Sequence, residues 1–262
     1  MNKINDLKIL LWDIETLPHL GAHWGMWKQN IAGGQIFQQS EMLCLSYKWL
    51  HSSRVHSISP LGQPGFKDDP YAFSGYIAEK FIPVLEQADF SVAHNGDKFD
   101  YPKLKAYACM NGLPPFRARK VDTLKMAKGV GMFPKGNRLD NLAEVLGVPF
   151  NKSPMSMPDW MDIALRRKNM VEKMTKMCDY CDQDVRVLEA VFLKLWPHCE
   201  FILPNVHVLT GGAKDIPGCD RCGSENLVKN GRYVKNVLVY QRYKCLDCGA
   251  QPIGRKALKL EV

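Results

Sequence analysis

The stretch Lys8–Pro18, which reads KILLWDIETLP, constrains the fold of this chain more than any other part of the sequence. Four largely apolar residues rich in strand formers run directly into two acids, a pattern typical of a buried central strand that carries carboxylates at its end. Strand residues two apart point to the same face, so we expect Asp13 and Glu15 to project side by side and Ile14 to face the other way.

This pair of acids requires neutralisation if the strand end is buried. Two adjacent carboxylates repel each other unless protons or cations offset their charge. A divalent cation is the simplest solution, and carboxylate oxygens favour magnesium or manganese over zinc. Taken alone, the Asp-Ile-Glu motif favours a strand end with two solvated acids, so the metal-site interpretation depends on finding further acids.

Composition bounds the class of protein. With 262 residues and 46% hydrophobic content, the chain suits one medium domain plus a small appendage. The formal charge of +8 favours a polyanionic partner, with nucleic acid first among the candidates. The segment Met1–Asp6 lacks the apolar run of a signal peptide, and no stretch of about 18 apolar residues could span a membrane. We therefore expect a cytoplasmic protein without a membrane partner.

Strand and helix patterns alternate along the chain. Met42–Leu50 and Arg54–Ser59 read as strands that form a meander with the first one. Asp89–Gly96 is a short apolar strand, followed by a loop with Asp100 and then a helix. Ligands of α/β proteins commonly bind at such a junction of strand, loop and helix. Helical spacing marks Tyr76–Gln87, Leu139–Gly147 and a long helix over Val171–Trp196.

The long helix places Tyr180 and Asp184 four residues apart, hence on one face beside its apolar stripe. Cys178 and Cys181 lie inside that apolar pattern, so packing explains them better than metal binding. Asp182 points away from the Tyr180 and Asp184 face and is expected to be solvated.

Several polar segments have two alternative interpretations, one structural and one functional. His23–Lys28 combines aromatics with a base close to the carboxylate strand, and it either stacks on nucleotide bases or anchors a buried loop. Four basic residues around the Leu139 helix either meet phosphates or form a solvated face: Lys125, Lys128, Lys135 and Arg138. Asp122-Thr123 is typical of a helix cap. Asn95 either shapes its turn or touches substrate.

The C-terminal part of the chain has a different composition. Proline and glycine residues mark a linker at 204–218. Residues 219–262 then carry two Cys-x-x-Cys pairs, separated by 22 residues, that predict a ribbon with one structural zinc: Cys219, Cys222, Cys245 and Cys248. Nine cysteines in total, an odd number, also favour metal binding over a disulfide framework. Basic residues interleaved with tyrosines, among them Lys229, Arg232 and Arg242, suit a nucleic-acid backbone.

Three motifs of the main domain share their order and content with one enzyme family. They are Asp13-Ile14-Glu15, Asn95-Gly96-Asp97-Lys98-Phe99-Asp100 and Tyr180-Cys181-Asp182-Gln183-Asp184. The set resembles the DEDD exonuclease superfamily in its tyrosine subtype, whose motifs are Asp-x-Glu, Asn-x-x-x-Phe/Tyr-Asp and Tyr-x-x-x-Asp. The resemblance covers roughly residues 7–197. It is closest to proofreading domains of family B DNA polymerases and to free-standing phage or bacterial exonucleases.

The resemblance implies an α/β, ribonuclease-H-like fold for residues 1–203, with a mixed five-stranded sheet flanked by helices. It also implies 3′-to-5′ hydrolysis of DNA through two magnesium or manganese ions. Asp13 would be the shared ligand, Glu15 and Asp184 would serve the water-activating site, and Asp100 the second site. Tyr180 would position the attacking water. Substrate contacts are expected from Leu17, Asn95 and Phe99. The ribbon lies outside the resemblance and is similar to ribbons of transposases and other DNA-binding proteins.

Two other functions fit the same motifs. An exoribonuclease of the same superfamily would use the same residues, because such sites hold terminal nucleotides mostly through backbone, metals and stacking. A catalytically silent adaptor would use a degenerate nuclease fold to deliver the ribbon to DNA or RNA. Degenerate copies usually lose a metal ligand, and none of the five motif residues is missing here, which favours the enzyme.

Overall fold

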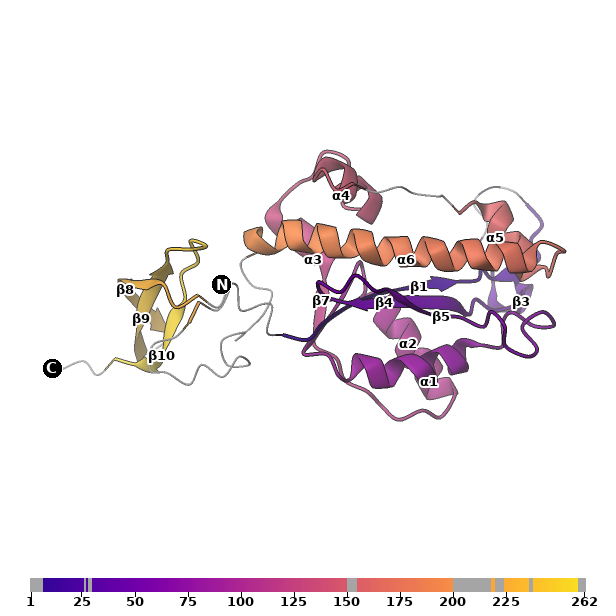
Figure 1. The fold of residues 1–262 in the computed structure, drawn as a ribbon, viewed down its shortest axis with the longest axis horizontal. Coiled ribbons are helices and arrows are strands. Elements are labelled where there is room, and N and C mark those ends of the chain that lie inside the picture. The colour runs from indigo at the N-terminus through magenta and orange to yellow at the C-terminus, as the bar shows by residue number, and fades with distance from the viewer. Residues whose placement is uncertain are drawn as a thin grey trace.

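The protein is described from a computed structural model (Figure 1). The described residues are 7–25, 27, 30–149, 155–199, 218–219, 224–235 and 238–258. Most of the predicted linker at 204–218, all but Gly218, lies outside them, as does Cys222.

A mixed five-stranded sheet with the order β5-β4-β1-β6-β7 forms the centre of the main domain. Its strands are β1 (Ile9–Thr16), β4 (Met42–Trp49), β5 (His56–Ile58), β6 (Phe90–Ala93) and β7 (Lys120–Asp122). The predicted meander is confirmed, because β1 pairs antiparallel with β4 and β4 with β5. On its other edge β1 pairs parallel with β6, which makes it the central strand.

Helices cover both faces of this sheet, as the sequence predicted (Figure 1). On one face lie α1 (Ser74–Leu85) and α2 (Asp100–Met110). On the other face lie α3 (Thr123–Val130), α4 (Leu139–Val145) and α6 (Met170–Leu195). The ends of the predicted helices differ from the observed ones by at most two residues, a normal uncertainty for frayed termini.

Alternation along β1 supplies both halves of the core. Ile9 and Leu11 pack into the cluster formed with α3, α4 and α6. Leu10, Trp12 and Ile14 pack on the opposite face, where the Trp12 ring lies 4.8 Å from that of Phe81 on α1. The strand is therefore apolar at every position from Ile9 to Trp12 because both of its faces are covered.

One prediction about α6 is corrected by the structure. Asp182 is not simply solvated, because its Oδ1 accepts hydrogen bonds from Ser46 Oγ at 2.6 Å and from Ser57 Oγ at 2.5 Å. Ser46 is on β4 and Ser57 is on β5, so Asp182 ties the helix to two strands. The helical spacing correctly predicted that the Asp182 side chain points away from Asp184. It could not show that two strands of the sheet lie on the side to which Asp182 points.

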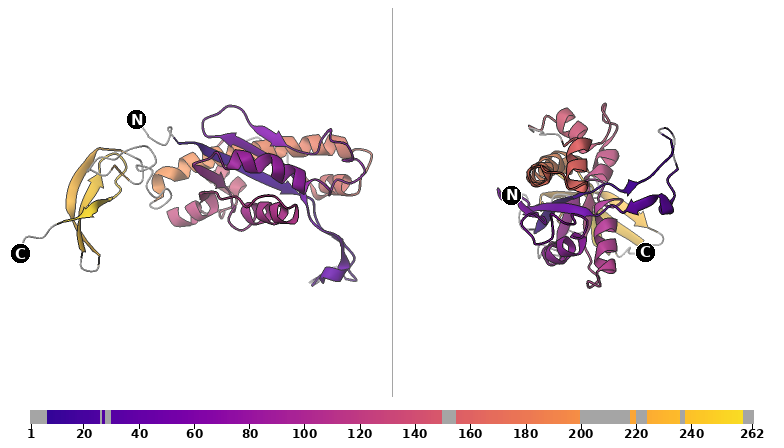
Figure 2. Two further views of the ribbon diagram at one scale, coloured as in Figure 1. Left: turned by 90° about the horizontal axis from the view of Figure 1, so that it is seen from below. Right: turned by 90° about the vertical axis from the view of Figure 1, so that its right-hand side faces the viewer.

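Three further elements extend the main domain. A hairpin not predicted from the sequence, β2 (Leu20–Gly21) with β3 (Ile36–Gln38), follows β1 and projects away from the sheet (Figure 2). Short 3-10 helices lie at Gly33–Gln35 and Trp196–His198, and α5 (Met157–Ala164) precedes α6. None of the helices in the described parts of the chain is long and apolar enough to cross a membrane.

The C-terminal region forms a separate three-stranded antiparallel sheet with the order β10-β9-β8. Its strands are β8 (Leu227–Lys235), β9 (Leu238–Cys245) and β10 (Ile253–Ala257). A hairpin of this size between the two predicted cysteine pairs is what the ribbon interpretation requires.

Candidate active site

Three of the predicted acids converge because β1 packs against α6. Asp13 and Glu15 occupy the odd-numbered positions of β1, on the same face as Ile9 and Leu11, which contact α6. Asp184 is on α6 itself. Single carboxylate oxygens of Asp13, Glu15 and Asp184 all lie within 4.8 Å of one another. The strand and the helix together thus form a compact acidic cluster.

Asp100 reaches the same region from the other side of the sheet. It is the first residue of α2, is only 1% exposed, and its Oδ1 accepts a hydrogen bond of 3.3 Å from the backbone N–H of Ile14. Burial raises the pKa of Asp100 to about 7. Its negative charge helps to raise the pKa of Asp13, which places the fourth acid beside the cluster.

The cluster is electrostatically unfavourable when it stands alone. Shielding from water raises the pKa of Asp13 well above its ordinary value. Nearby groups raise it further: Cys181, Asp100, Glu15 and Asp184. A divalent cation would relieve this repulsion, and an all-oxygen set of donors matches the preference of magnesium and manganese. The residues present therefore fit the group that the family resemblance implies.

Tyr180 lies one turn before Asp184 on α6 and lines the same pocket. Burial raises the pKa of its hydroxyl, and the charges of Asp184 and Glu15 raise it further. Tyr180 is therefore protonated at neutral pH, so it can donate a hydrogen bond but is a poor base.

Asp13, Glu15 and Asp184 line a pocket of about 590 Å³. The same pocket is lined by residues of α3, α4 and the loop between them, which contribute Lys128, Asn137, Arg138 and Asp140 among others. Among the described residues, Asn137 Oδ1 is buried with no hydrogen-bond partner. The lining therefore combines carboxylates with two basic side chains, those of Lys128 and Arg138.

This arrangement separates the four basic residues that the sequence left undecided. Lys125 and Lys135 form ion pairs with Asp97 and Glu144 respectively. Lys128 and Arg138 instead line the pocket, where Arg138 Nε lies 3.3 Å from Asp140 Oδ1.

The turn after β6 supplies the residues expected to touch substrate. Asn95 has a φ of 60° and its backbone N–H donates to Asp122 Oδ1 at 2.9 Å, so it shapes the turn while lining the pocket. Phe99 also lines the pocket and is 37% exposed. Asp122 caps α3 through the N–H of Leu124, as its sequence predicted. His94 contributes a ring whose pKa is lowered by burial.

Leu17 is not placed at the pocket, and the expectation for it is corrected. Its side chain is 0% exposed and packs in a core cluster with Leu43 and Cys44. The chain turns after β1, and the backbone N–H of Leu17 donates to Glu41 O at 2.9 Å, which directs the side chain inward. A leucine beside two acids carries no sequence signal that separates these two orientations.

A residue that sequence reasoning missed, Trp160 on α5, contacts Tyr180. The two rings meet edge to face with centroids 6.3 Å apart, and Trp160 Nε1 donates to Thr16 O at 3.1 Å. The contact thus joins α5, the end of β1 and the α6 residue that lines the pocket. Its partners are 20 and 144 residues distant in sequence, so no local pattern reveals it.

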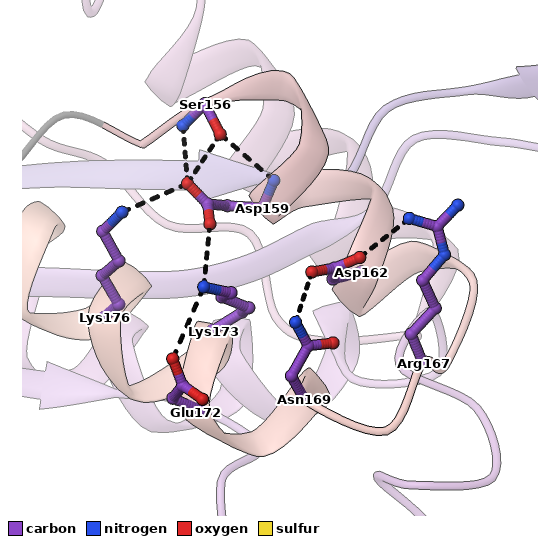
Figure 3. A network of polar contacts seen from close by, with 8 residues as sticks. All are labelled: Ser156, Asp159, Asp162, Arg167, Asn169, Glu172, Lys173 and Lys176. Carbon is purple, nitrogen blue, oxygen red and sulfur yellow. Dashed lines mark hydrogen bonds and ion pairs between the residues drawn. The ribbon is translucent and has the colours of Figure 1, made fainter.

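A polar network holds α5 against the start of α6 (Figure 3). Asp159 accepts hydrogen bonds from the backbone N–H and the hydroxyl of Ser156, at 2.9 and 2.8 Å. It also contacts Lys173 Nζ and Lys176 Nζ on α6, each at 3.2 Å. The Ser156 bonds, followed by the lysines, hold the pKa of Asp159 well below its usual range. Trp160, the next residue, is therefore fixed on an anchored helix.

In the C-terminal sheet, three of the four predicted zinc ligands come together. Sulfur atoms of Cys219, Cys245 and Cys248 lie within 4.8 Å of one another, and those of Cys219 and Cys248 are 3.5 Å apart. This group could bind a metal, and Cys222, the fourth predicted ligand, lies outside the described residues.

The predicted basic contacts of this sheet lie on its two longer strands. Lys229 and Arg232 are exposed on β8. Arg242 on β9 is partly buried, because its Nε donates to Asn230 O at 2.9 Å. The two exposed side chains have room to meet a ligand, whereas Arg242 also holds the bulged part of β8.

Comparison with known proteins identifies the family. The family model described as the RNase_H superfamily matches residues 63–196. Among solved structures, the family B DNA polymerase of the hyperthermophilic archaeon Pyrobaculum calidifontis is similar, with 17% sequence identity and a TM-score of 0.49. That alignment covers 90% of this chain and 32% of the polymerase chain, so the chain spans about a third of that protein. No curated protein matches the sequence. Because the family model spans more than half of the 262 residues, and includes the elements that carry Asp100 and Asp184, the chain belongs to the RNase_H superfamily.

Proposed function

We propose that this protein is a metal-dependent 3′-to-5′ exonuclease that removes nucleotides from single-stranded or frayed 3′ ends of DNA. Membership in the RNase_H superfamily supports a nuclease that acts on nucleic acid. The observation that carries the proposal is the cluster of Asp13, Glu15 and Asp184, whose carboxylate oxygens lie within 4.8 Å of one another. Asp100 and Tyr180 border the same cluster.

Each of these residues has a role that its environment supports. Asp13, central in the cluster, would be the ligand shared by two cations, with Glu15 and Asp184 on one and Asp100 on the other. When bound, two magnesium or manganese ions supply the Lewis acidity that activates water and stabilises the departing 3′ oxygen. Tyr180, held protonated, donates a hydrogen bond that orients the attacking water.

Other residues of the pocket lining suit the nucleic-acid strand. Lys128 and Arg138 line the same pocket as the acids and would contact phosphate oxygens of the substrate. Phe99 offers an exposed ring for a terminal base. Asn137, whose buried Oδ1 has no hydrogen-bond partner among the described residues, would accept from a sugar hydroxyl or a base.

Trp160 would act as a positioning residue for Tyr180. Trp160→Ala removes the ring that contacts Tyr180, so we expect kcat to fall by about tenfold while KM changes little. Trp160→Phe keeps an aromatic ring at the contact and should restore most of the rate. Steady-state kinetics of the three proteins measure this effect. A kcat that stays low in Trp160→Phe, or a loss confined to thermal stability, would contradict the positioning role.

The C-terminal sheet would be a zinc ribbon that adds nucleic-acid contacts to the nuclease domain. We propose residues 1–203 as that domain, 204–218 as a linker and 219–262 as the ribbon. Cys219, Cys222, Cys245 and Cys248 would hold one structural zinc. Lys229, Arg232 and Arg242 would contact the backbone of the substrate.

Elemental analysis tests the ribbon directly. The purified protein should contain one zinc per chain, and Cys245→Ser should lose it, because a thiolate ligand is replaced by a hydroxyl. Cys109→Ser is a matched control, since Cys109 is an exposed thiol on α2 far from the cluster in sequence, and it should keep the zinc. A wild-type protein without zinc, or Cys245→Ser with full zinc, would refute the ribbon.

One assay tests the proposed function against its two alternatives. The protein is incubated with magnesium or manganese and with 5′-labelled single-stranded DNA, duplex DNA or RNA of one sequence. The proposal expects a ladder of products shortened from the 3′ end on DNA. A ladder on RNA alone would indicate the exoribonuclease. Tight binding of every strand without any cleavage would indicate the silent adaptor.

A further inference from the structure

The hairpin formed by β2 and β3 presents aromatic side chains to solvent. Trp24 and Trp27, between the two strands, are 101% and 82% exposed, and Phe37 on β3 is 72% exposed. This resolves the sequence alternative, because the tryptophans do not anchor a buried loop. Two indoles as exposed as these form a large apolar surface, and such a surface marks an interaction site.

The stem of the hairpin is built to hold this tip. The side chain of Gln35 links the two sides of the hairpin. Its Nε2 donates to Ala22 O at 3.0 Å, and its Oε1 accepts from the N–H of Ala32 at 2.8 Å. The backbone N–H of Ala22 also donates to Gln35 O at 2.9 Å. The strands approach so closely at Gly21 that a Cβ there would lie 2.7 Å from Gln35 O. The tip is therefore carried on a defined stem.

The base of the hairpin is fixed to the strand that carries the acids. The hairpin begins four residues after β1 ends, just beyond Glu15. Three hydrogen bonds hold the connection: Trp160 Nε1 to Thr16 O at 3.1 Å, Tyr71 Oη to Pro18 O at 3.0 Å, and Ser40 N to His19 Nδ1 at 2.9 Å. The hairpin thus extends from the end of the strand that carries Asp13 and Glu15, and it projects away from the sheet (Figure 2).

The charge of the hairpin segment indicates which kind of ligand it can bind. Residues 17–40 contain one lysine, two histidines and no acid, in a chain that has 27 acids. A segment free of carboxylates does not repel a polyanion, and exposed aromatic rings bind unpaired bases by stacking. We propose that Trp24 and Trp27 bind single-stranded nucleic acid by base stacking and lead the strand toward the carboxylate cluster. This inference rests on the proposed nuclease function and names a second substrate contact for it.

Affinity for a single strand tests the inference. We expect Trp24→Ala and Trp27→Ala each to weaken binding of a 20-nucleotide single-stranded DNA by about five- to 100-fold, which corresponds to the loss of one stacked base. Fluorescence anisotropy without added divalent metal measures this affinity while the strand stays intact. Met110→Ala is the matched control, because Met110 is 69% exposed at the end of α2, and it should bind like the wild type.

Two further comparisons distinguish base stacking from nonspecific hydrophobic binding. Trp24→Phe keeps a π face and should retain most of the affinity, whereas Trp24→Leu, equally apolar, should not. A strand with abasic sites should bind the wild type more weakly, and the tryptophan variants should lose little further affinity on it. This double-mutant cycle measures the coupling between ring and base.

Several results would overturn the inference. Wild-type affinity in both alanine variants would do so, as would a loss of equal size on the intact and the abasic strand. A change of self-association in sedimentation velocity, with unchanged DNA affinity, would show that the tip contacts a second copy of the chain instead. Hydrolysis of the p-nitrophenyl ester of thymidine monophosphate by the wild type tests the proposed function separately, because this substrate has a single base. Binding without hydrolysis of this ester or of strands would refute the nuclease and leave the hairpin contact standing.

Discussion

Replacing Asp13 with asparagine is expected to lower phosphodiester cleavage on the order of 10⁴-fold, the scale for loss of a central catalytic carboxylate. Asp13 is the acid whose pKa is raised by all three of the other carboxylates, which identifies it as the centre of the cluster. Asparagine keeps the size and removes the charge. Asp97→Asn is the matched control, because Asp97 pairs with Lys120 and Lys125 outside the pocket and should leave the rate unchanged.

The same variant should have the opposite effect on stability. An acid whose folded pKa is raised above its unfolded value destabilises the fold when ionised, so stability lost at neutral pH returns as the pH falls through the folded pKa. Without added magnesium, Asp13→Asn should therefore melt at or above the wild-type temperature at pH 7, and this advantage should vanish below about pH 4. Added manganese should raise the melting temperature of the wild type but not of the variant. Full activity or an unchanged manganese response in Asp13→Asn would refute the metal-site assignment.

Tyr180→Phe is expected to lower kcat by about 10- to 1,000-fold, the range of single positioning groups, while the protein still binds metal and substrate. The variant keeps the ring that contacts Trp160 and loses only the hydroxyl that orients water. Single-turnover rates at saturating metal measure the loss, and the manganese-dependent rise in melting temperature reports the metal site. The high pKa of the hydroxyl also means that the rate should show no inflection from Tyr180 between pH 6 and 9.

Asp184→Asn provides the contrast for Tyr180→Phe. It removes a charge from the cluster, so metal affinity and rate should fall together. If Tyr180 were only a helix residue at the edge of the core, Tyr180→Phe would cleave at the wild-type rate under saturating metal. That result would leave the activation of water to the metals and the carboxylates.

The sequence predicted the centre of the fold well because its signals are local. Apolar residues at every position from Ile9 to Trp12, followed by Asp13 and Glu15, predict a strand covered on both faces, and the sheet with helices on both sides confirms this. The odd and even positions of β1 then predict which face the acids share. The four-residue spacing on α6 predicted that Tyr180 and Asp184 share one face of that helix.

What the sequence could not supply depends on contacts between distant segments. Trp160 approaches Tyr180 only because Asp159 anchors α5 to Lys173 and Lys176, and these contacts follow from packing. The burial of Leu17 follows from the turn of the chain at Glu41.

The hairpin escaped prediction for a related reason. Its strands have only two and three residues, too few for an alternating pattern. The exposure of Trp24 and Trp27 follows from where that short stem projects, which a sequence rich in aromatics does not show.

A time course on one doubly labelled strand tests the central claim most directly. A single-stranded DNA carries a fluorophore at its 5′ end and a radioactive phosphate in its 3′-terminal linkage, and the reaction contains manganese. The account predicts that the radioactive label appears first, as a mononucleotide, while the fluorescent strand shortens one nucleotide at a time, and that Asp13→Asn yields neither product. Release of the fluorophore first, internal fragments as the earliest products, or equal cleavage by Asp13→Asn would contradict it.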